Sequence, residues 1–485
     1  MNDLVKKQCD LISELGDSNF LSSDKEIYSY KSFANSVNEK IVKLKGIGCN
    51  QGDGVALGTS HGLDYFISFI AILAIDCVVI PIDKSANQDA INFIFEKTKP
   101  KVILGVENKS FDYIPNLHES KVYPSQLGAI LFTSGSSGTP KGVMLTSAAL
   151  LGNALATLRP LDFNKNDHLF VNTPYHFTSA ICHFLSAFFS TGKLTIIETK
   201  LLPLDLISAI SDSGANAFGG APIQLLWIVG AINSSLNLRW VMTSGDDLPE
   251  STQKQLATKY PKSHLFVFYG LTECGGRFCA RSPTNNSAKY RSVGKPIPGM
   301  KVEIVDTASN SLAAGNIGEV VVYGKFLMSG YLGEDKPIFT SNGGLKTGDS
   351  GYIDESGNLY LLGRLDDVFK VAGQKVSGLR IRDAILQTKM VCDAFIIPFR
   401  DANSGVIPGL IYVEDSKITF EKSLFIRKLR SLLPTNHIPR KLIVVSNIER
   451  TGSGKIIKKN LINNLAKLNI ARLEDGSFTE ESVSN

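Results

Sequence analysis

The chain has 485 residues, of which 43% are hydrophobic and 20% are charged, a balance that is typical of a soluble globular protein. At roughly 100 to 200 residues per domain, this length predicts about two to four structural units and is too long for a simple binding module. The 51 basic and 46 acidic side chains give a net charge of +5 without forming a basic block, which argues against a nucleic-acid-binding protein.

The cysteines and the first residues indicate a reduced, cytoplasmic protein. Seven cysteines are scattered along the chain, and none forms the CxxC pair that is typical of zinc sites. The first residues, MNDLVKKQCDLISELGD, lack the apolar region of a secretory signal. The most apolar stretch, at 65–75, is bracketed by Asp64 and Asp76 and is too short to span a bilayer. We therefore expect a buried helix there, followed by a strand, and no membrane span.

The apolar pattern predicts an α/β fold in two domains. From about residue 30 to residue 360, strands alternate with amphipathic helices, which predicts stacked βαβ units with buried sheets. Between 293 and 362, Gly, Asn and Asp turns separate short strands, which predicts a small antiparallel β unit attached to the larger body. We expect residues 1–365 to form a large N-terminal domain, residues 366–473 a small α+β domain, and the polar residues 474–485 a disordered tail.

The most informative segment is AILFTSGSSGTPKGVMLT at 129–146, a loop rich in Gly, Ser and Thr between two short apolar strands. Small residues let backbone N–H groups and hydroxyl groups surround phosphate oxygens, and Lys141 adds a mobile positive charge. The loop is not a Walker motif, because Pro140 precedes the lysine and Gly142 follows it. A hairpin turn needs only about two to five residues, so the composition favours a phosphate-binding loop.

Within this loop, TSGSSGTPKG resembles the signature of the adenylate-forming superfamily, which includes acyl- and aryl-CoA ligases, peptide-synthetase adenylation domains and luciferases. Further segments resemble other motifs of this family and follow in the family's order: YGLTE at 269–273, GEVVVYGKFLMSGY at 318–331, KTGDSGYIDESG at 346–357, GRLDDVFKVAGQKVSG at 363–378 and RTGSGKI at 450–456. The resemblance implies an enzyme that uses ATP to convert a carboxylic acid to acyl-AMP, releases pyrophosphate, and then transfers the acyl group to a thiol.

The resemblance assigns residues to the phosphates of ATP. The departing pyrophosphate would be held by the loop, at Thr133, Ser134, Gly135, Ser136, Ser137, Gly138, Thr139 and Lys141. Thr272 would contact the α-phosphate. Glu273 would help to hold the Mg²⁺ ion that bridges phosphate oxygens, a role that suits a hard carboxylate ligand.

The nucleoside is assigned to three further segments. Adenine would stack on the ring of Tyr269, and the backbone at Gly245 and Asp246 would cover its other face. Asp349 would accept hydrogen bonds from the ribose hydroxyl groups with the assistance of Arg364, although an aspartate in a glycine-rich turn is more often a turn former.

Two residues are assigned to the catalytic cycle. Lys455 would reach into the site and stabilise the transition state of adenylation. The alternative interpretation of a lysine in such a loop is a solvated side chain. Asp366 matches the hinge about which a mobile C-terminal domain rotates between the two half-reactions. The loop at 370–378 would then line a channel for a phosphopantetheine arm.

The acid pocket is assigned by motif register alone. The segment NTPYHFTSA at 172–180 lacks the Asp with which amino-acid-activating relatives pair the substrate ammonium group. His176 instead resembles the position that acyl- and aryl-CoA ligases use beside the substrate carboxylate; a partly buried histidine bonded to backbone is the alternative. The other candidate pocket residues are Phe177, Met242, Ser244, Phe268, Gly275 and Gly276. Because the two glycines leave room for a chain or ring, we expect an apolar carboxylic acid.

The thiol acceptor stays open between coenzyme A and the phosphopantetheine arm of an acyl carrier protein acting in trans. The His176 motif favours coenzyme A narrowly. A catalytically silent nucleotide-binding module is the third alternative, and it is disfavoured because Lys141, Glu273, Asp349 and Lys455 are all retained.

The chain departs from the family pattern at three positions. Arg380 and Arg382 stand where the family usually has acidic residues, and Glu449 stands where it usually has proline. The charge reversal affects the expected contacts of the local helix and the expected carrier-facing surface, and it leaves the ATP residues unchanged.

Overall fold

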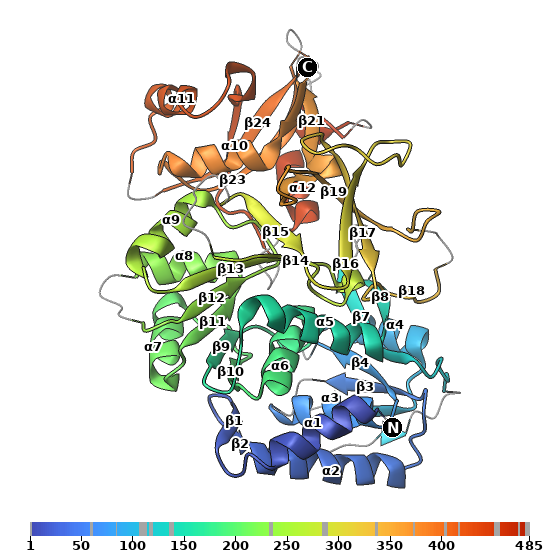
Figure 1. Ribbon diagram of the computed structural model, residues 1–485. Coiled ribbons are helices and arrows are strands. Elements are labelled where there is room, and N and C mark those ends of the chain that lie inside the picture. Colours follow the sequence, from blue (N-terminus) through green and yellow to red (C-terminus); the bar gives the residue numbers. More distant parts are fainter. Residues whose placement is uncertain are drawn as a thin grey trace.

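The computed structural model describes residues 2–58, 62–83, 85–105, 114–115, 120–134, 140–231, 236–283, 290–334, 338–371, 374–401, 405–415, 418–450, 456–473 and 476–480. The first three-quarters of the chain form a large body, and the last part of the chain gathers at one end of it (Figure 1). Helices pack on β-sheets in both parts, so the fold is the mixed α/β fold that the sequence predicts.

The first sheet contains the predicted phosphate loop. Its seven strands follow the order β18 (Gly330–Tyr331), β8 (Pro140–Thr146), β7 (Leu127–Ser134), β4 (Val78–Ile82), β3 (Gly54–Gly58), β5 (Val102–Leu104) and β6 (Ile114–Pro115). The strands β7, β4, β3 and β5 run parallel, whereas β7 and β8 form an antiparallel hairpin. The apolar run predicted to be a buried helix is α3 (Asp64–Ala74), and it leads into β4 as predicted.

The second sheet is the largest element of the body. Its thirteen strands follow the order β16 (Met300–Val305), β17 (Gly318–Gly324), β19 (Leu345–Ile353), β20 (Leu359–Arg364), β15 (Ser292–Pro296), β14 (Cys279–Arg281), β13 (His264–Tyr269), β12 (Trp240–Thr243), β11 (Ala217–Gly220), β9 (His168–Asn172), β10 (Lys193–Ile197), β1 (Asn19–Ser22) and β2 (Ile27–Ser29). The pairs between β1 and β13 are parallel, and those from β13 to β16 are antiparallel. The predicted antiparallel unit therefore continues the parallel sheet.

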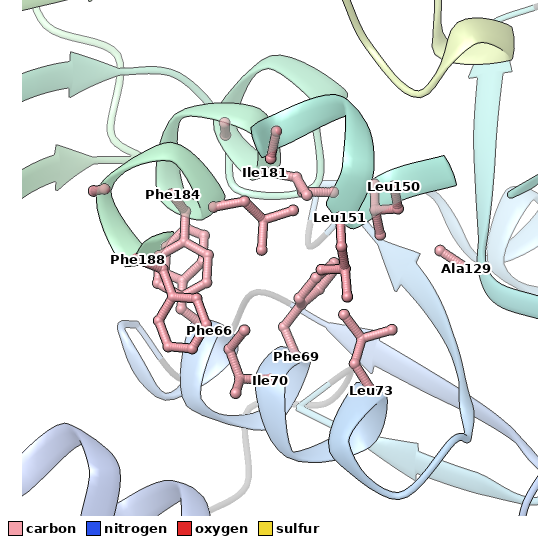
Figure 2. Close-up of a cluster of buried hydrophobic side chains, with 14 of the residues drawn as sticks. Phe66, Phe69, Ile70, Leu73, Ala129, Leu150, Leu151, Ile181, Phe184 and Phe188 are labelled. Carbon is pink, nitrogen blue, oxygen red and sulfur yellow. The ribbon is translucent and has the colours of Figure 1, made fainter. Parts of the chain in front are cut away.

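Two helices fill the space between these sheets. The helix α5 (Ser147–Leu161) packs on β7 and β8, while α6 (Thr178–Ser190) packs on β9, β10 and α5. Figure 2 shows Phe66 and Phe69 of α3 meeting Leu151 of α5 and Phe184 of α6 in the buried centre of the body. The hydroxyl group of Thr146 accepts the Ala149 N–H at 3.0 Å, which fixes the start of α5 directly after β8.

The remaining helices of the body cover its outer faces. They are α1 (Asp3–Ser13), α2 (Tyr30–Gly46), α4 (Gln88–Thr98), α7 (Pro203–Ser213), α8 (Pro222–Gly230) and α9 (Glu250–Lys259). The helices α1 and α2 pack on α3 at the end of the body that lies opposite the C-terminal part (Figure 1). Among the described helices, none is both long enough and apolar enough to cross a lipid bilayer.

The C-terminal part begins at the predicted hinge. The short 3₁₀-helix η3 (Leu365–Asp367) leads into the hairpin of β21 (Val368–Val371) and β22 (Gln374–Ser377). A five-stranded sheet follows, in the order β25 (Lys441–Val444), β24 (Gly405–Glu414), β23 (Val391–Asp401), β27 (Phe478–Glu480) and β26 (Ile470–Arg472). The helix α10 (Gly378–Gln387) packs on β23 and β20, and the remaining helical elements are α11 (Lys422–Arg430), η4 (Thr435–His437) and α12 (Lys458–Ala466).

The prediction of a disordered tail from residue 474 is wrong for residues 478–480. β27 pairs in parallel with β23, at Phe399 and Phe478, and Phe478 is only 6% exposed. A single buried aromatic ring anchors this polar stretch, and burial of one side chain is not visible in a composition that is rich in Ser and Glu.

Candidate active site

The predicted phosphate loop joins the two strands of an antiparallel hairpin. β7 and β8 pair as far as the loop itself, with Thr133 opposite Lys141 and Ser134 opposite Pro140. The predicted contacts Gly135, Ser136, Ser137, Gly138 and Thr139 lie outside the described residues, as does the side chain of Ser134. The hairpin therefore brings Thr133 and Lys141 together at the base of the loop.

Lys141 is held by two neighbouring side chains. Its Nζ lies 2.9 Å from Glu334 Oε2 and 4.7 Å from the centre of the Tyr331 ring. β18 pairs with β8 and places Tyr331 opposite Val143, two residues from the lysine, so sheet pairing sets the second contact. Both partners of the ion pair are about one-third exposed, at 31% and 34%, so a phosphate group can reach the ammonium group from solvent.

Tyr331 also contacts the predicted metal ligand. Its hydroxyl group donates to Glu273 Oε1 at 2.7 Å, and the pKa of Tyr331 is raised by burial and then by the charge of Glu273, so the phenol keeps its proton. Glu273 lies in the 3₁₀-helix η1 (Thr272–Cys274), where its carbonyl accepts the Met328 N–H at 2.8 Å. One carboxylate oxygen is thus oriented by Tyr331, and Glu273 can offer the other to Mg²⁺ on the phosphates of ATP.

Thr272 links the phosphate side of the site to the predicted acid side. Its Oγ1 lies 2.9 Å from Oγ1 of Thr178, the first residue of α6. Thr178 directly follows His176 and Phe177, which the sequence assigns to the acid pocket. The predicted α-phosphate contact and the predicted acid pocket therefore adjoin, as attack of a carboxylate on that phosphate requires.

The predicted ribose ligand is the centre of a hydrogen-bonded cluster. Asp349 is 8% exposed, and its Oδ1 accepts a hydrogen bond from Arg364 Nη1 at 3.1 Å. The hydroxyl group of Tyr269 donates to Asp349 Oδ2. The Tyr269 ring contacts Phe278, with ring centres 4.4 Å apart. The structure thus brings together Tyr269, Asp349 and Arg364, the three side chains assigned to the nucleoside.

The backbone predicted to cover adenine lies against the C-terminal part. Gly245 has a φ of 98°, a conformation that favours glycine. Asp246 Oδ2 lies 3.6 Å from Arg450 Nη1, and Arg450 also donates to Asp393 Oδ1 at 2.9 Å. An isolated bridge pairs Arg450 with Ile456, so both ends of the segment that contains Lys455 lie beside each other; Lys455 itself lies outside the described residues.

His176 is half-buried and neutral at the acid side of the site. Burial lowers its pKa, and this effect outweighs the opposing charge of Asp83, whose Oδ2 lies 3.7 Å from His176 Nε2. The imidazole packs edge-on against Phe177, with ring centres 4.5 Å apart. The sequence missed Asp83 because this carboxylate follows β4 and is remote from the motif in the chain.

Three of the candidate pocket residues, Gly275, Gly276 and Met242, have a different role or setting from the one predicted. The glycines do not leave open space: a Cβ at Gly276 would lie 2.4 Å from Cys182 Sγ, and a Cβ at Gly275 would lie 3.2 Å from Asn153 Cβ. Their small size is used for close packing of η1 against α5 and α6. Met242 is buried, and the buried Arg277 lies next to it, which the expectation of an apolar pocket did not anticipate.

Of the other candidate pocket residues, Phe268 is buried, and Ser244, which directly follows β12, is half-buried. Arg277 lies over the Phe268 ring, with its guanidinium carbon 4.8 Å from the ring centre. The one sequence signal for Arg277 was its position directly after Gly275 and Gly276, which follow the YGLTE motif and which the sequence assigned to the acid pocket. For Tyr331 and Glu334, the only signal was their position at the end of the motif at 318–331.

The hinge assignment falls at the junction of the two parts. Asp366 is the central residue of η3, between β20 and β21, and its side chain lies outside the described residues. The loop predicted to line a pantetheine channel includes β21 and β22, whose pairing places Val371 opposite Gln374. The assignment of Asp366 as a hinge stays a prediction.

The two arginines that depart from the family pattern lie on α10. Arg380 is exposed and contributes, after burial, to lowering the pKa of His437. Arg382 faces the carboxyl groups of Asp247 and Asp383 where α10 meets the body. At position 382, nearby carboxylates therefore compensate the positive charge that replaces the usual acidic residue.

Comparison with known proteins shows the family and the fold. The model of the AMP-binding enzyme family matches residues 12–124 and 113–332. The D-alanine–D-alanyl carrier protein ligase of Bacillus licheniformis is 28% identical over 81% of this chain and 86% of its own, and a putative acyl–CoA ligase of Bacillus subtilis is 27% identical over 90% and 94%. An anthranilate CoA ligase structure in complex with anthranoyl-AMP superposes with a TM-score of 0.84 at 18% identity, over 95% of this chain and 98% of that chain.

Proposed function

Because the chain belongs to the family of AMP-binding enzymes, we propose that it activates a carboxylic acid with Mg-ATP as acyl-AMP and then transfers the acyl group to a thiol. The observation that carries this proposal is the continuous line of contacts from Lys141 through Tyr331 to Glu273 and from Thr272 to Thr178. It connects groups suited to a triphosphate with the first turn of the helix beside the predicted acid pocket.

Each side chain has a task in the first half-reaction. Attack of a carboxylate on the α-phosphate concentrates negative charge between two anions, so positive groups and hydrogen-bond donors must stabilise the transition state. Lys141 would neutralise the departing pyrophosphate and Thr272 would donate to the α-phosphate. Glu273 would bind the Mg²⁺ that enters with ATP. Lys455, in the segment next to Arg450, would supply a second cation at the reacting oxygens.

Asp349 and Tyr269 would hold the nucleoside during this step. The Asp349 carboxylate accepts from both Tyr269 and Arg364, which fixes its orientation before it accepts hydrogen bonds from ribose hydroxyl groups. Tyr269 stays protonated, because burial and the charge of Asp349 raise its pKa well above the ordinary value. A rigid nucleoside site of this kind reduces the entropy that these side chains lose when ATP binds.

For the second half-reaction we infer that coenzyme A is the acceptor. The absence of a carboxylate within the His176 motif is the feature that favours an acyl- or aryl-CoA ligase over an amino-acid-activating enzyme. A carrier protein in trans is the second candidate, and the similarity to a D-alanine–D-alanyl carrier protein ligase supports it. Incubation with acid, ATP and each acceptor separately distinguishes the two, because carrier acylation without acyl-CoA would exclude coenzyme A.

The proposal is tested by a pyrophosphate-release screen with Mg-ATP and a broad set of carboxylic acids. We expect acid-dependent release with at least one acid, and loss of release in Lys141→Ala. A matched control is Lys346→Ala, because Lys346 has a similar exposure of 38% and pairs with Glu319 outside the predicted site. If no acid gives release and no AMP binds, the protein is not an adenylating enzyme.

A further inference from the structure

Arg277 is a buried cation in the predicted acid pocket. The residue is 2% exposed and lies directly after Gly276. Its Nη2 lies 3.1 Å from His183 Nδ1 and 3.4 Å from Met242 Sδ, and the guanidinium group stacks over Phe268. Its Nε and Nη1 are buried and have no hydrogen-bond partner among the described residues.

No described carboxylate neutralises this guanidinium group. Burial is the main influence on Arg277 and lowers its pKa; the one opposing neighbour among the described residues is Cys182, whose thiol stays neutral because burial raises its own pKa. Burial together with the charge of Arg277 lowers the pKa of His183 well below its ordinary value, so the imidazole is neutral and can only accept from the arginine. An arginine nevertheless stays protonated in proteins, so the site holds an uncompensated positive charge.

A buried charge without a counter-ion destabilises a fold, and unpaired buried donors add to that cost. The aromatic face of Phe268 and the sulfur of Met242 are weak partners for a guanidinium group. The arrangement is therefore incomplete by itself, and an anion that bonds to Nε or Nη1 would complete it.

The place of Arg277 in the site shows which ligand can supply that anion. Met242, Phe268 and Gly276 are three of the residues assigned to the acid pocket, and they surround or adjoin the arginine. The Cβ position of Gly276 lies 3.4 Å from Thr178 Cγ2, and Thr178 contacts Thr272 of the predicted α-phosphate site. Arg277 thus lies among the residues assigned to the acid pocket, where an acid bound for attack on the α-phosphate can reach it.

We propose that Arg277, oriented by His183, binds a second carboxylate of the substrate and that the acid is a dicarboxylic acid. This inference rests on the proposed adenylation activity and specifies its substrate class. One carboxylate attacks the α-phosphate, while the other stays ionised against Arg277. An apolar acid of the same length would leave the guanidinium group buried and unpaired, which is how the site discriminates against it.

The experiment compares each member of a series of unbranched dicarboxylic acids, from malonic to adipic acid, with its monomethyl ester and its monoamide. Pyrophosphate release is measured with Mg-ATP, and thermal unfolding is measured with each acid and no ATP. We expect one dicarboxylic acid to exceed its ester and amide in kcat/KM by about 10- to 100-fold, the usual effect of a charge-assisted hydrogen bond. The same acid should raise Tm without ATP.

Arg277→Met should lose the preference for that dicarboxylic acid over its ester. Because an uncompensated buried charge is replaced by an apolar chain of similar length, the variant should also unfold at a higher temperature than the parent when no acid is present. Arg281→Met is the control: Arg281 is 5% exposed and donates to the Tyr290 carbonyl at 2.8 Å, so its loss should lower Tm and keep the preference. A lower Tm in Arg277→Met with an unchanged preference would make Arg277 structural and overturn the inference.

The outcomes separate this inference from the proposed function. If monocarboxylic acids are adenylated with the same kcat/KM as the dicarboxylic acids, the dicarboxylate site is refuted and adenylation stands. If a dicarboxylic acid raises Tm through Arg277 but no acid releases pyrophosphate, the binding site stands and adenylation is refuted.

Discussion

At the scale of single residues, the ammonium group of Lys141 already pairs with a carboxylate of the protein, that of Glu334. Glu334 Oε2 lies 2.9 Å from Lys141 Nζ, so in the proposed function the phosphates of ATP would compete with this carboxylate for the lysine. The pair is partly exposed, and such pairs contribute only about 0.2 to 1 kcal/mol. Displacement therefore costs little, and Tyr331 keeps the ammonium group in place while it occurs.

Glu334→Gln should lower the KM for ATP by up to about fivefold, because the lysine then has no competing carboxylate. Pyrophosphate release at varied ATP concentration measures this change, and Glu319→Gln is a control at an ion pair outside the site. An increase in KM for ATP would instead mean that Glu334 contributes to binding of the metal–nucleotide complex.

At the scale of elements, the helix and strands with the clearest apolar pattern were predictable. All but the last residue of the run at 65–75 lie in α3, and ten of the eleven residues of α3 are buried, so the helix requires no polar face. The contacts of α10 were not predictable, because they depend on pairing between distant charged residues. Arg382 faces Asp247, and Arg291 lies 3.3 Å from Asp383, yet the two residues of each pair are far apart in the chain.

The stability of the contact between α10 and the body, at Asp247 and Asp383, should depend on pH. Burial, and then the charge of Asp247, raises the pKa of Asp383 well above its ordinary value. Burial also raises the pKa of Asp247, and the charge of Asp246 adds to this effect. The charges of Arg291 and Arg382 oppose both shifts. Acids with a raised pKa in the folded protein bind more protons there than in the unfolded chain. Their contribution to stability is therefore present below the ordinary Asp pKa of about 3.9 and is lost as the pH rises through the raised values.

Hydrogen exchange of the α10 amides, corrected for the intrinsic rate, should show less protection as the pH rises from acidic to neutral. Asp383→Asn should remove most of this dependence, because it eliminates one of the two coupled carboxyl groups. Asp205→Asn, at an exposed position of α7, should leave the dependence unchanged. An identical pH profile in Asp383→Asn and the parent would contradict the assignment.

At the scale of the whole molecule, the proposed mechanism uses two arrangements of the C-terminal part, one for each half-reaction. Arg450 connects this part to the body through Asp246 and is bonded to Asp393 within its own sheet. This contact holds Arg450, the first residue of the RTGSGKI motif, against Asp246, whose backbone is predicted to cover adenine. Rotation about η3 would break the contact between Arg450 and Asp246 and leave that between Arg450 and Asp393 intact.

Lys455→Ala should slow adenylation by about 10² to 10³, the usual effect of losing one charge contact to a transition state. Transfer from preformed acyl-AMP to the thiol should continue, because the rotated domain no longer presents the lysine to the site. Asp366→Pro should have the reverse effect by restricting the backbone of η3. Rapid-quench measurement of the two half-reactions checks both variants, and equal losses in both steps would argue against alternation of the domain.

Sequence motifs predicted that Tyr269, Asp349 and Arg364 lie together, although their role in binding ATP stays a prediction, and these motifs did not predict the buried Arg277. Lys141, Glu273 and Asp349 lie in motifs whose local sequence is tied to phosphate and ribose chemistry. The residues assigned to the acid pocket come from the segment after η1, from the segment before α6 and from the parallel strands, so the burial of Arg277 depends on how these elements pack in the assembled fold. A charged residue next to two glycines gives no local signal of that burial.

The most direct test follows one oxygen atom through the reaction. If the carboxylate attacks the α-phosphate, an acid labelled with heavy oxygen in its carboxyl group forms labelled acyl-AMP, and transfer to the thiol leaves one labelled oxygen in AMP. We predict AMP with one heavy oxygen per turnover and unlabelled pyrophosphate, measured by mass spectrometry. Label in inorganic phosphate, with ADP as the nucleotide product, would contradict adenylation and show activation through an acyl phosphate.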